Sequence, residues 1–283
     1  EGIKISSKQY DLRIKEDANK MVEKHKPDVI IHTAATVGGV GGNMKHPGSF
    51  FYDNIMMNTN IIQAATTYKV PRLVSFLSTC VFPDKVEYPL TENKIHLGPP
   101  HNSNFGYAYA KRMAEVQTRA YNKEFGTNYF TIIPTNAYGP RDNFNLENGH
   151  VIPMLIHKCY LAKQNNTDFE VWGSGTPLRE FVYSEDIANI IDLLVEKYDG
   201  TEPVIVSNPI EYSIKQVVDL IVECMEFEGK VVWLSDKPDG QFRKPSSNAK
   251  LLSIIGDYEF IPLEVGLKQT INWFKENYPN IRK

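Results

Sequence analysis

The stretch DVIIHTAATVGGVGGN, residues 28–43, joins an apolar run to a loop with four glycines. The apolar run at 28–35 predicts a buried strand. A dinucleotide-binding fingerprint needs the pattern G-x-G-x-x-G on a turn that leads from a strand directly into a helix. Gly39 and Gly41 fit the first two places, but Met44 takes the third, and we expect no helix immediately after it. We therefore interpret the stretch as a flexible loop whose missing side chains let a ligand approach the backbone.

Apolar and amphipathic segments alternate on both sides of this stretch. They predict strands at 3–7, 28–35, 72–78 and 129–135, helices at 14–26, 49–68 and 105–125, and a proline-rich loop at 82–104. Strands that alternate with helices favour an α/β fold with a Rossmann-like, doubly wound parallel sheet. Ligands of such sheets bind beyond the carboxyl ends of the strands, so we expect the loops after residues 35, 78 and 135 to meet there.

The second half of the chain predicts a smaller α/β lobe. Its helices are expected at 151–163, 184–198, 213–225 and 264–278, and its strands at 169–172, 203–208 and 231–234. We predict a dinucleotide-binding lobe of residues 1–148 plus about 180–212. The other residues, about 149–179 plus 213–283, form the expected substrate lobe.

Composition argues against several classes of protein. The 283 residues carry a net charge of −3, whereas a nucleic-acid partner would select a basic surplus on one face. The widely spaced Cys80, Cys159 and Cys224 predict neither a disulfide framework nor a metal site, so a reducing, cytoplasmic location is expected. No apolar run reaches the ~18 residues of a membrane span, and no secretory signal opens the chain.

The sharpest chemical signal is the pair of Tyr107 and Lys111 on the helix predicted at 105–125. Four residues apart, the two side chains share one face of the helix. A neighbouring ammonium group favours the phenolate and brings the tyrosine pKa, ordinarily near ~10, closer to the range useful for proton transfer. Ser78, at the end of a predicted strand, adds a hydroxyl that can bind a substrate carbonyl and the tyrosine. Taken alone, such a pair is more often a surface contact, and such a serine more often forms a turn.

Six segments carry a resemblance to a known family. They read STCVFPD (78–84), GPPHNSNFGYAYAKRMAE (98–115), PTNAYGPRDNFN (134–145), GHVIPMLIHK (149–158), VWGSGTPLREF (171–181) and KPDGQFRK (237–244). Together with the ordered serine, tyrosine and lysine, they resemble the extended short-chain dehydrogenase/reductase superfamily and, within it, the GDP-L-fucose synthase family. The resemblance extends from about residue 28 to the C-terminus. The loop TAATVGG also resembles the cofactor loop of this family, which lies beside the dinucleotide without cradling its phosphates.

The resemblance implies an NADPH-dependent enzyme with two activities. It would convert GDP-4-keto-6-deoxy-D-mannose to GDP-L-fucose by 3,5-epimerisation followed by reduction of the 4-keto group. Two alternatives stay open: another nucleotide-sugar epimerase or reductase of the superfamily, and a truncated, inactive chain that binds GDP-sugar. Helices 49–68 and 105–125 are expected to pair with a second copy in a homodimer, as they do in many members of the superfamily.

The resemblance also implies roles for five residues. Tyr107 would give its proton to the C4 oxygen as hydride arrives from the nicotinamide, Lys111 would hold the nicotinamide ribose, and Ser78 would bond the C4 carbonyl. Cys80 and His150 would serve the epimerisation as base and acid. Outside the family, Cys80 is readable as a small buried apolar residue and His150 as a helix cap.

Further positions are expected to contact the ligands. Those expected at the cofactor are Ser7, Lys8, Ala34, Ala35, Val37, Gly38, Leu77, Ser78, Thr79, Lys111, Pro134, Thr135, Asn136, Ala137 and His150. Those that match the grip of the family on the GDP-sugar are Lys158, Trp172, Arg179 and Asp239. A lysine and an arginine suit a pyrophosphate, and a carboxylate suits hydroxyl groups.

The sequence departs from the family at its start. Family members begin with a strand and a glycine-rich turn that opens the first helix, whereas residue 1 here lies at the expected second strand, so we expect a unit of roughly 30 residues to be absent. The predicted strand 3–7 ends at Ser6, Ser7 and Lys8, where NAD enzymes usually carry an acidic residue. Hydroxyl and ammonium groups suit a 2′-phosphate and favour NADPH. The alternative is that these residues only form a solvated turn.

Overall fold

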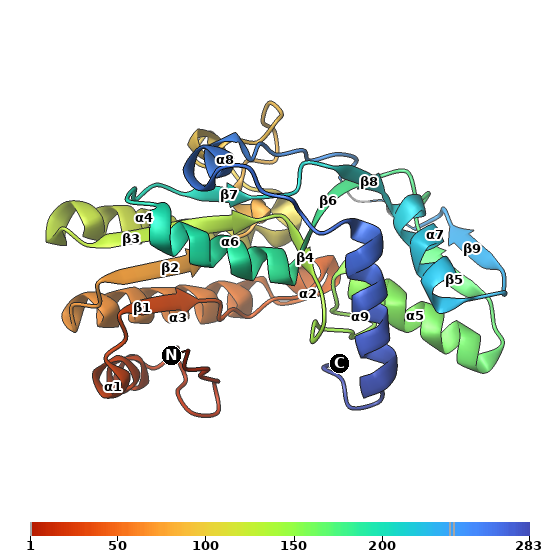
Figure 1. Cartoon of the computed structure of the whole chain (residues 1–283), viewed down its shortest axis with the longest axis horizontal. Helices are drawn as coiled ribbons and strands as arrows, with labels where there is room; N and C mark the ends of the chain where they lie inside the picture. Colours follow the sequence, from red (N-terminus) through yellow and green to blue (C-terminus); the bar gives the residue numbers. More distant parts are fainter. Residues whose placement is uncertain (1, 238, 240) are drawn as a thin grey trace. The chain divides into compact units, whose positions relative to one another are not determined.

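The computed structural model describes residues 2–237, 239 and 241–283, which divide into two compact units (Figure 1). The first unit runs up to Val86 and adds Thr91–Pro134 and Val195–Ile205. The second unit consists of Glu87–Leu90, Thr135–Leu194 and Val206–Lys283.

The first unit is built on a four-stranded sheet with the strand order β1-β2-β3-β7 (Figure 1). The strands are β1 (Val29–His32), β2 (Arg72–Phe76), β3 (Asn128–Pro134) and β7 (Val204–Val206). β1, β2 and β3 run parallel, with Ile31 opposite Val74 and Val74 opposite Phe130. Val74 and Phe130 are completely buried, as expected for strands covered on both faces. The three carboxyl ends therefore lie along one edge of the sheet.

Three long helices belong to the first unit: α1 (Lys15–His25), α3 (Pro47–Thr67) and α4 (Phe105–Phe125). α3 and α4 pack side by side along the sheet (Figure 1). Pro47 occupies the first turn of α3, where a residue without an N–H is tolerated. α4 ends at Gly126, whose φ of 65° is accessible to glycine at little cost. Short 3₁₀ helices lie at η1 (Thr79–Val81), η2 (Glu92–Lys94) and η3 (Asn102–Asn104).

The predicted Rossmann-like α/β class is confirmed, and two local predictions in the first unit are wrong. Residues 3–7 form no strand, because no neighbouring strand supplies ladder hydrogen bonds within the described residues and Ile3 and Ile5 are exposed. A short helix, α2 (Val40–Lys45), begins inside the glycine-rich stretch and includes Gly41 and Gly42. It is stabilised locally, since the Asn43 amide donates to the carbonyl oxygens of Gly38 and Gly39.

The second unit contains a three-stranded sheet, a strand pair, four complete helices and most of α6 (Ser184–Lys197) within the described residues. The sheet has the order β4-β6-β8, and β5 pairs with β9. The strands are β4 (Asn136–Tyr138), β5 (Phe169–Trp172), β6 (Leu178–Tyr183), β8 (Glu211–Ser213) and β9 (Val231–Leu234), and the helices are α5 (Val151–Asn165), α7 (Ile214–Met225), α8 (Ala249–Ile255) and α9 (Leu263–Asn277). β4, β6, β8 and α8 had not been predicted, because β4, β8 and α8 are short and the charged Arg179 and Glu180 interrupt the apolar residues of β6.

The core of the second unit lies among α5, α7 and α9. Phe144, Phe169 and Phe274 are completely buried there, and Phe144 lies 4.9 Å from Phe274 between ring centroids. A capping box starts α7, since the Ser213 hydroxyl and the Gln216 amide each accept the backbone N–H of the other residue. Across the described part of the chain, no helix is long and apolar enough to cross a membrane.

The limits of the two units differ from those of the predicted lobes. Residues 135–148 and 180–194 fall in the second unit. The reason is strand pairing, since β4 pairs with β6 and β6 pairs with β8 instead of joining the four-stranded sheet. The helix α6 (Ser184–Lys197) begins in the second unit and ends in the first. The roles predicted for the two lobes stay predictions.

Candidate functional site

Ser78 and Cys80 lie just beyond the carboxyl end of β2. The Leu77 N–H donates to the Ile132 carbonyl at 2.8 Å, which extends the pairing of β2 with β3 by one residue. The chain then turns into η1, where the Ser78 hydroxyl accepts the Cys80 N–H at 3.4 Å. Both side chains are half-buried at the strand end, the position at which α/β sheets carry their ligands.

Tyr107 and Lys111 meet this strand end from α4. The Tyr107 phenol and the Ser78 hydroxyl share a hydrogen bond. The Lys111 ammonium is 1% exposed and donates to the Phe76 carbonyl at 2.9 Å. The structure therefore brings together the three groups Ser78, Tyr107 and Lys111, as the ordered motif predicts.

The expected acidification of Tyr107 by Lys111 is wrong for this structure. Burial raises the pKa of Tyr107, the neighbouring Cys80 raises it further, and the hydrogen bond with Ser78 lowers it. Burial also lowers the pKa of Lys111 to about 8, because a charged ammonium is disfavoured without water. Tyr107 is therefore protonated at neutral pH, which suits a proton donor rather than a base.

The loop after β1 is held by a buried amide from α3. Asn54, which is completely buried, accepts the Thr36 N–H at 3.1 Å and donates to the Thr36 carbonyl at 2.8 Å. Gly38 lies against Phe50, where an added Cβ would approach the ring to 3.1 Å. Ala34, Ala35 and Val37 are half-buried on the same loop, so small side chains leave its backbone open. Their contact with a cofactor stays a prediction.

The residues at the strand ends fit the nicotinamide half of a dinucleotide. Lys111 has three N–H donors, and Phe76 takes one of them. The other donors suit the hydroxyls of a ribose, while Ser78 and Thr79 at the strand end are half-buried and Leu77 is buried.

Ser7 and Lys8 do not lie at a strand end. Both are exposed in a turn in which the Ser6 carbonyl accepts the N–H groups of Gln9 and Tyr10. The structure thus agrees with the alternative interpretation of these residues as a solvated turn. The preference for NADPH was inferred from their expected place at a strand end, and this structure does not support that inference.

Pro134 ends β3 in the first unit, whereas the other three residues of that motif belong to the second. Thr135 donates its N–H to the Val206 carbonyl at 3.1 Å, and its hydroxyl is buried without a hydrogen-bond partner among the described residues. Asn136 and Ala137 lie in β4, and the Asn136 amide donates to the Glu180 carbonyl at 2.8 Å, so Asn136 does not simply form a turn. The orphaned Thr135 hydroxyl is compatible with the predicted cofactor contact.

His150 lies at the N-cap of α5 in the second unit. Its side chain is exposed and makes no capping hydrogen bond. His150 therefore occupies the N-cap position, but its side chain does not cap the helix. Its predicted part in proton transfer stays a prediction.

Two of the four predicted GDP-sugar residues are in contact in the second unit. The Lys158 ammonium on α5 lies 5.0 Å from the ring centroid of Trp172 at the end of β5. The indole is 59% exposed, and burial lowers the pKa of Lys158 while Glu170 opposes the shift. An exposed aromatic face beside a cation suits a planar, anionic ligand.

The other two residues involve a strap in the second unit, defined here as the described residues of 236–248: Asp239 belongs to the strap, and Arg179 contacts it from β6. Arg179 donates to the Phe242 carbonyl at 3.4 Å, and burial lowers its pKa. Asp239 accepts the Ser174 N–H at 2.6 Å and the Ser174 hydroxyl at 2.8 Å. The strap is thereby fixed beside Trp172, since Ser174 follows it by two residues.

Sequence reasoning missed Glu180, which anchors the far end of the strap. Glu180 is 3% exposed and accepts the Ser246 N–H at 2.8 Å and the Ser246 hydroxyl at 2.6 Å. Burial raises its pKa to about 7; Glu211 acts in the same direction, and Arg243 and the bonds from Ser246 oppose it. A signal for Glu180 was present in the sequence, because it is a charged residue directly before the apolar residues of the segment LREFVY. Only its neighbour Arg179 was selected from that segment as a site residue.

This buried carboxyl predicts a pH-dependent stability. A folded-state pKa of about 7 exceeds the unfolded value of 4.5, so the folded state binds the proton more tightly, and Glu180 destabilises the fold as the pH rises through this window. Between pH 4.5 and about pH 8, we expect Glu180→Gln to gain about 1–3 kcal/mol of unfolding free energy relative to the parent. Urea unfolding of both proteins checks this. His32 has a pKa lowered to about 4 by burial and contributes with the opposite sign in both proteins, so it cancels in the difference. A constant difference across the window would contradict the prediction.

Arg112, the residue after Lys111, was also missed. It is 5% exposed and donates to the carbonyl oxygens of Val81 and Gly98, each at 2.9 Å. It ties η1 and the long loop to α4, and thereby supports the segment that carries Cys80.

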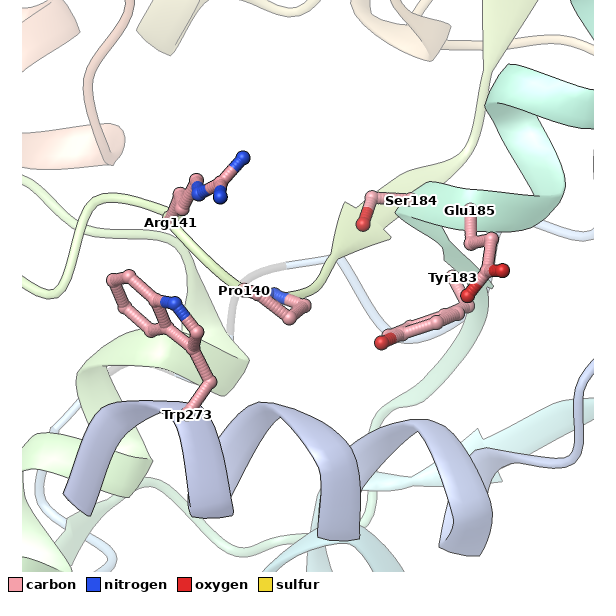
Figure 2. Close-up of a pocket in the computed structure, with 6 residues that line it drawn as sticks. All are labelled: Pro140, Arg141, Tyr183, Ser184, Glu185 and Trp273. Carbon is pink, nitrogen blue, oxygen red and sulfur yellow. The ribbon is translucent and has the colours of Figure 1, made fainter. Parts of the chain in front are cut away.

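A separate cavity in the second unit contains none of the predicted site residues. It has a volume of about 270 Å³ and is lined by Pro140, Arg141, Tyr183, Ser184, Glu185 and Trp273 (Figure 2). Trp273 projects from α9, while Ser184 and Glu185 start α6.

Comparison with known proteins agrees with this fold. The model of the NAD dependent epimerase/dehydratase family matches residues 4–208. Because this match covers more than half of the chain, the protein belongs to the NAD dependent epimerase/dehydratase family.

Individual relatives indicate a particular family within this class of enzymes. A GDP-L-fucose synthase of Dictyostelium discoideum is 47% identical over 281 residues, which cover 99% of this chain and 88% of the relative. A probable GDP-L-fucose synthase of Drosophila melanogaster is 41% identical, with 98% and 89% covered. The crystal structure of a GDP-L-fucose synthetase from Naegleria fowleri bound to NADP superposes with a TM-score of 0.94 at 46% identity, with 99% and 86% covered. The chain belongs to the GDP-L-fucose synthase family.

Proposed function

We propose that this protein converts GDP-4-keto-6-deoxy-D-mannose to GDP-L-fucose with NADPH as reductant. The observation that carries the proposal is the cluster of Ser78, Tyr107 and Lys111 in a chain 47% identical to a GDP-L-fucose synthase. The cofactor is supported by the NADP-bound relative of 46% identity. The same identity favours this reading over a different nucleotide-sugar epimerase or reductase.

The first step is epimerisation at C3 and C5. The C4 carbonyl acidifies the hydrogens at both neighbouring carbons, and removal of one proton leaves an enolate. Ser78 and Tyr107 hydrogen-bond its oxygen, which stabilises the developing negative charge. We assign the proton transfers to Cys80 and His150, and return of a proton to the opposite face inverts each carbon without net oxidation.

The second step is reduction of C4, for which NADPH supplies a hydride. Tyr107 gives its phenolic proton to the C4 oxygen, so that the carbonyl becomes a hydroxyl. The raised pKa of Tyr107 keeps this proton in place until the oxygen becomes basic. Ser78 orients the carbonyl, and Lys111 holds the ribose hydroxyls of the cofactor with its unbonded donors.

The GDP moiety is assigned to the second unit. Lys158 and Arg179 bind the pyrophosphate, and the exposed face of Trp172 stacks on a ring of the ligand. Asp239 accepts hydrogen bonds from hydroxyl groups of the ligand while it holds Ser174.

Turnover tests the proposal directly. Incubation with GDP-4-keto-6-deoxymannose and NADPH should oxidise the cofactor and yield GDP-L-fucose, detected by loss of NADPH absorbance and by NMR of the product. Binding of the GDP-sugar without cofactor oxidation would instead support an inactive nucleotide-sugar-binding chain.

We also propose that the protein acts as a cytoplasmic homodimer joined through α3 and α4. An apolar groove of about 440 Å³ is lined by residues of both helices, namely Pro47, Gly48, Phe51, Phe105, Gly106, Tyr109 and Met113. Phe51 and Phe105 are 40% and 45% exposed, and a second copy of the same groove would cover them.

Introducing a charge into this groove should separate the copies. Phe105→Glu is expected to weaken dimerisation by at least about tenfold, because a carboxylate would be buried without a partner. Analytical ultracentrifugation measures the dissociation constant. Phe125→Glu is the matched control, since Phe125 is 53% exposed at the other end of α4 and outside the groove. Equal dissociation constants for the two variants would refute this interface.

A further inference from the structure

Asn104 makes an unusual contact at the start of α4. It occupies the N-cap, where an asparagine side chain ordinarily accepts a backbone N–H of the first helical turn. No such capping bond forms here, and the backbone has φ −138° and ψ 22°. Its amide Nδ2 instead donates to the Sγ of Cys80 at 3.1 Å. The side chain therefore gives up a helix cap for a contact with a thiol.

The other end of the same amide has no partner. The Oδ1 of Asn104 is buried and accepts no hydrogen bond from any residue that the structure describes. A buried carbonyl oxygen without a donor is costly, and so is an uncapped helix start. Two unfavourable features in one side chain point to a ligand that supplies the missing donor.

Asn104 and Tyr107 at the start of α4 contact η1 and its N-cap in reverse order along the chain. Tyr107 shares a hydrogen bond with Ser78, and Asn104 donates to Cys80, two residues further along. Ser78 also accepts the Cys80 N–H. The phenol and the thiol are thus fixed on one frame, so that a single bound sugar ring can meet both groups.

We propose that Asn104 is a positioning residue for Cys80 in the epimerisation, an inference that rests on the proposed function. An N–H donor to sulfur stabilises the thiolate, which is the basic form of cysteine. The thiolate takes the proton from the carbon beside the C4 carbonyl, the C–H electron pair forms the enolate, and no oxidant is needed. The unpaired Oδ1 accepts a hydrogen bond from a hydroxyl of the hexose.

The test uses substitutions that keep a residue type favoured at helix N-caps at position 104. Aspartate and serine cap helices about as well as asparagine, but neither donates an N–H to sulfur. We expect Asn104→Asp and Asn104→Ser to slow the alkylation of Cys80 by iodoacetamide at neutral pH by about 10- to 50-fold. Peptide mass spectrometry measures the rate of alkylation at Cys80. The rate at the half-buried Cys224 is the internal control, because it should stay unchanged if the fold is intact. Asn102→Asp, an exposed position in η3, is the control for charge.

A second readout separates the two catalytic steps. Incorporation of deuterium from heavy water at C3 and C5 should fall at least about tenfold in the Asn104 variants. The kcat for NADPH oxidation with saturating epimerised 4-keto sugar should fall less than the exchange does, because loss of the contact with the hexose hydroxyl is expected to raise KM. Parent-like alkylation and exchange in both variants would overturn the role of Asn104. Absence of exchange and of NADPH oxidation in the parent itself would instead reject the proposed function, and the alkylation assay, which needs no substrate, would still report on Asn104.

Discussion

Tyr107→Phe is expected to lower kcat for reduction of the 4-keto group by about 10²- to 10⁴-fold. The substitution removes the phenolic hydroxyl and keeps the aromatic ring on α4. Because burial raises the pKa of Tyr107, the hydroxyl is the protonated donor at neutral pH, and no described group besides Ser78 shares its hydrogen bond. Stopped-flow measurement of NADPH oxidation gives the rate constant.

Two comparisons show whether the loss of kcat comes from the missing proton donor or from a change in structure or cofactor binding. NADPH affinity, measured by fluorescence titration, should stay within about threefold of the parent because the substitution removes a single hydroxyl group and keeps the ring. Tyr109→Phe, two residues along the same helix, should keep the parental rate. A Tyr107→Phe variant that retains more than about a tenth of the parental kcat would show that another group delivers the proton.

Gly106→Ala should be the most damaging small substitution near the site. A Cβ at position 106 would overlap the backbone carbonyl of Pro47 at the start of α3, and backbone atoms cannot rotate away. Overpacking of this kind costs about 1–3 kcal/mol, although alanine is intrinsically the better helix former. The first turn of α4 must shift, and Tyr107 shifts with it. We expect kcat to fall by at least about tenfold, because misplacement by about 1 Å is sufficient to do so.

Denaturant unfolding and steady-state kinetics check this prediction together. Gly41→Ala is the matched control, since Gly41 also lies in a helix but has nothing within 4 Å of the added Cβ. Its unfolding free energy should be equal to or slightly above that of the parent. If Gly106→Ala unfolds at the same denaturant concentration as the control, the close approach of α3 and α4 does not restrict the size of the side chain at position 106.

The long periodic segments of the sequence predicted most of the first unit. The helix predicted at 105–125 has the same limits as α4, and the strand at 72–78 contains β2. Such segments carry enough apolar residues at one period to select helix or strand locally. The strand predicted at 3–7 failed because a strand also needs a partner, and local sequence does not say whether one is present.

The site was predictable to the extent that its residues share an element. Tyr107 and Lys111 lie one turn apart on α4, so their common face follows from helix geometry alone. The direction of the Tyr107 pKa did not follow, because burial and Cys80 outweigh the expected effect of Lys111. Burial is a property of the packed structure and cannot be read from the spacing of two residues.

The sequence by itself determined the α/β class, the strand-end serine, the tyrosine–lysine pair and the family to which they belong. Only the tertiary structure decided that Asn104 contacts Cys80, that Asn54 holds the loop at Thr36, and that Glu180 anchors Ser246. Each of these contacts joins residues 18 to 66 positions apart in the chain. Periodicity acts over a few residues, whereas such contacts depend on how separate elements pack, and that is set by the shape of the whole core.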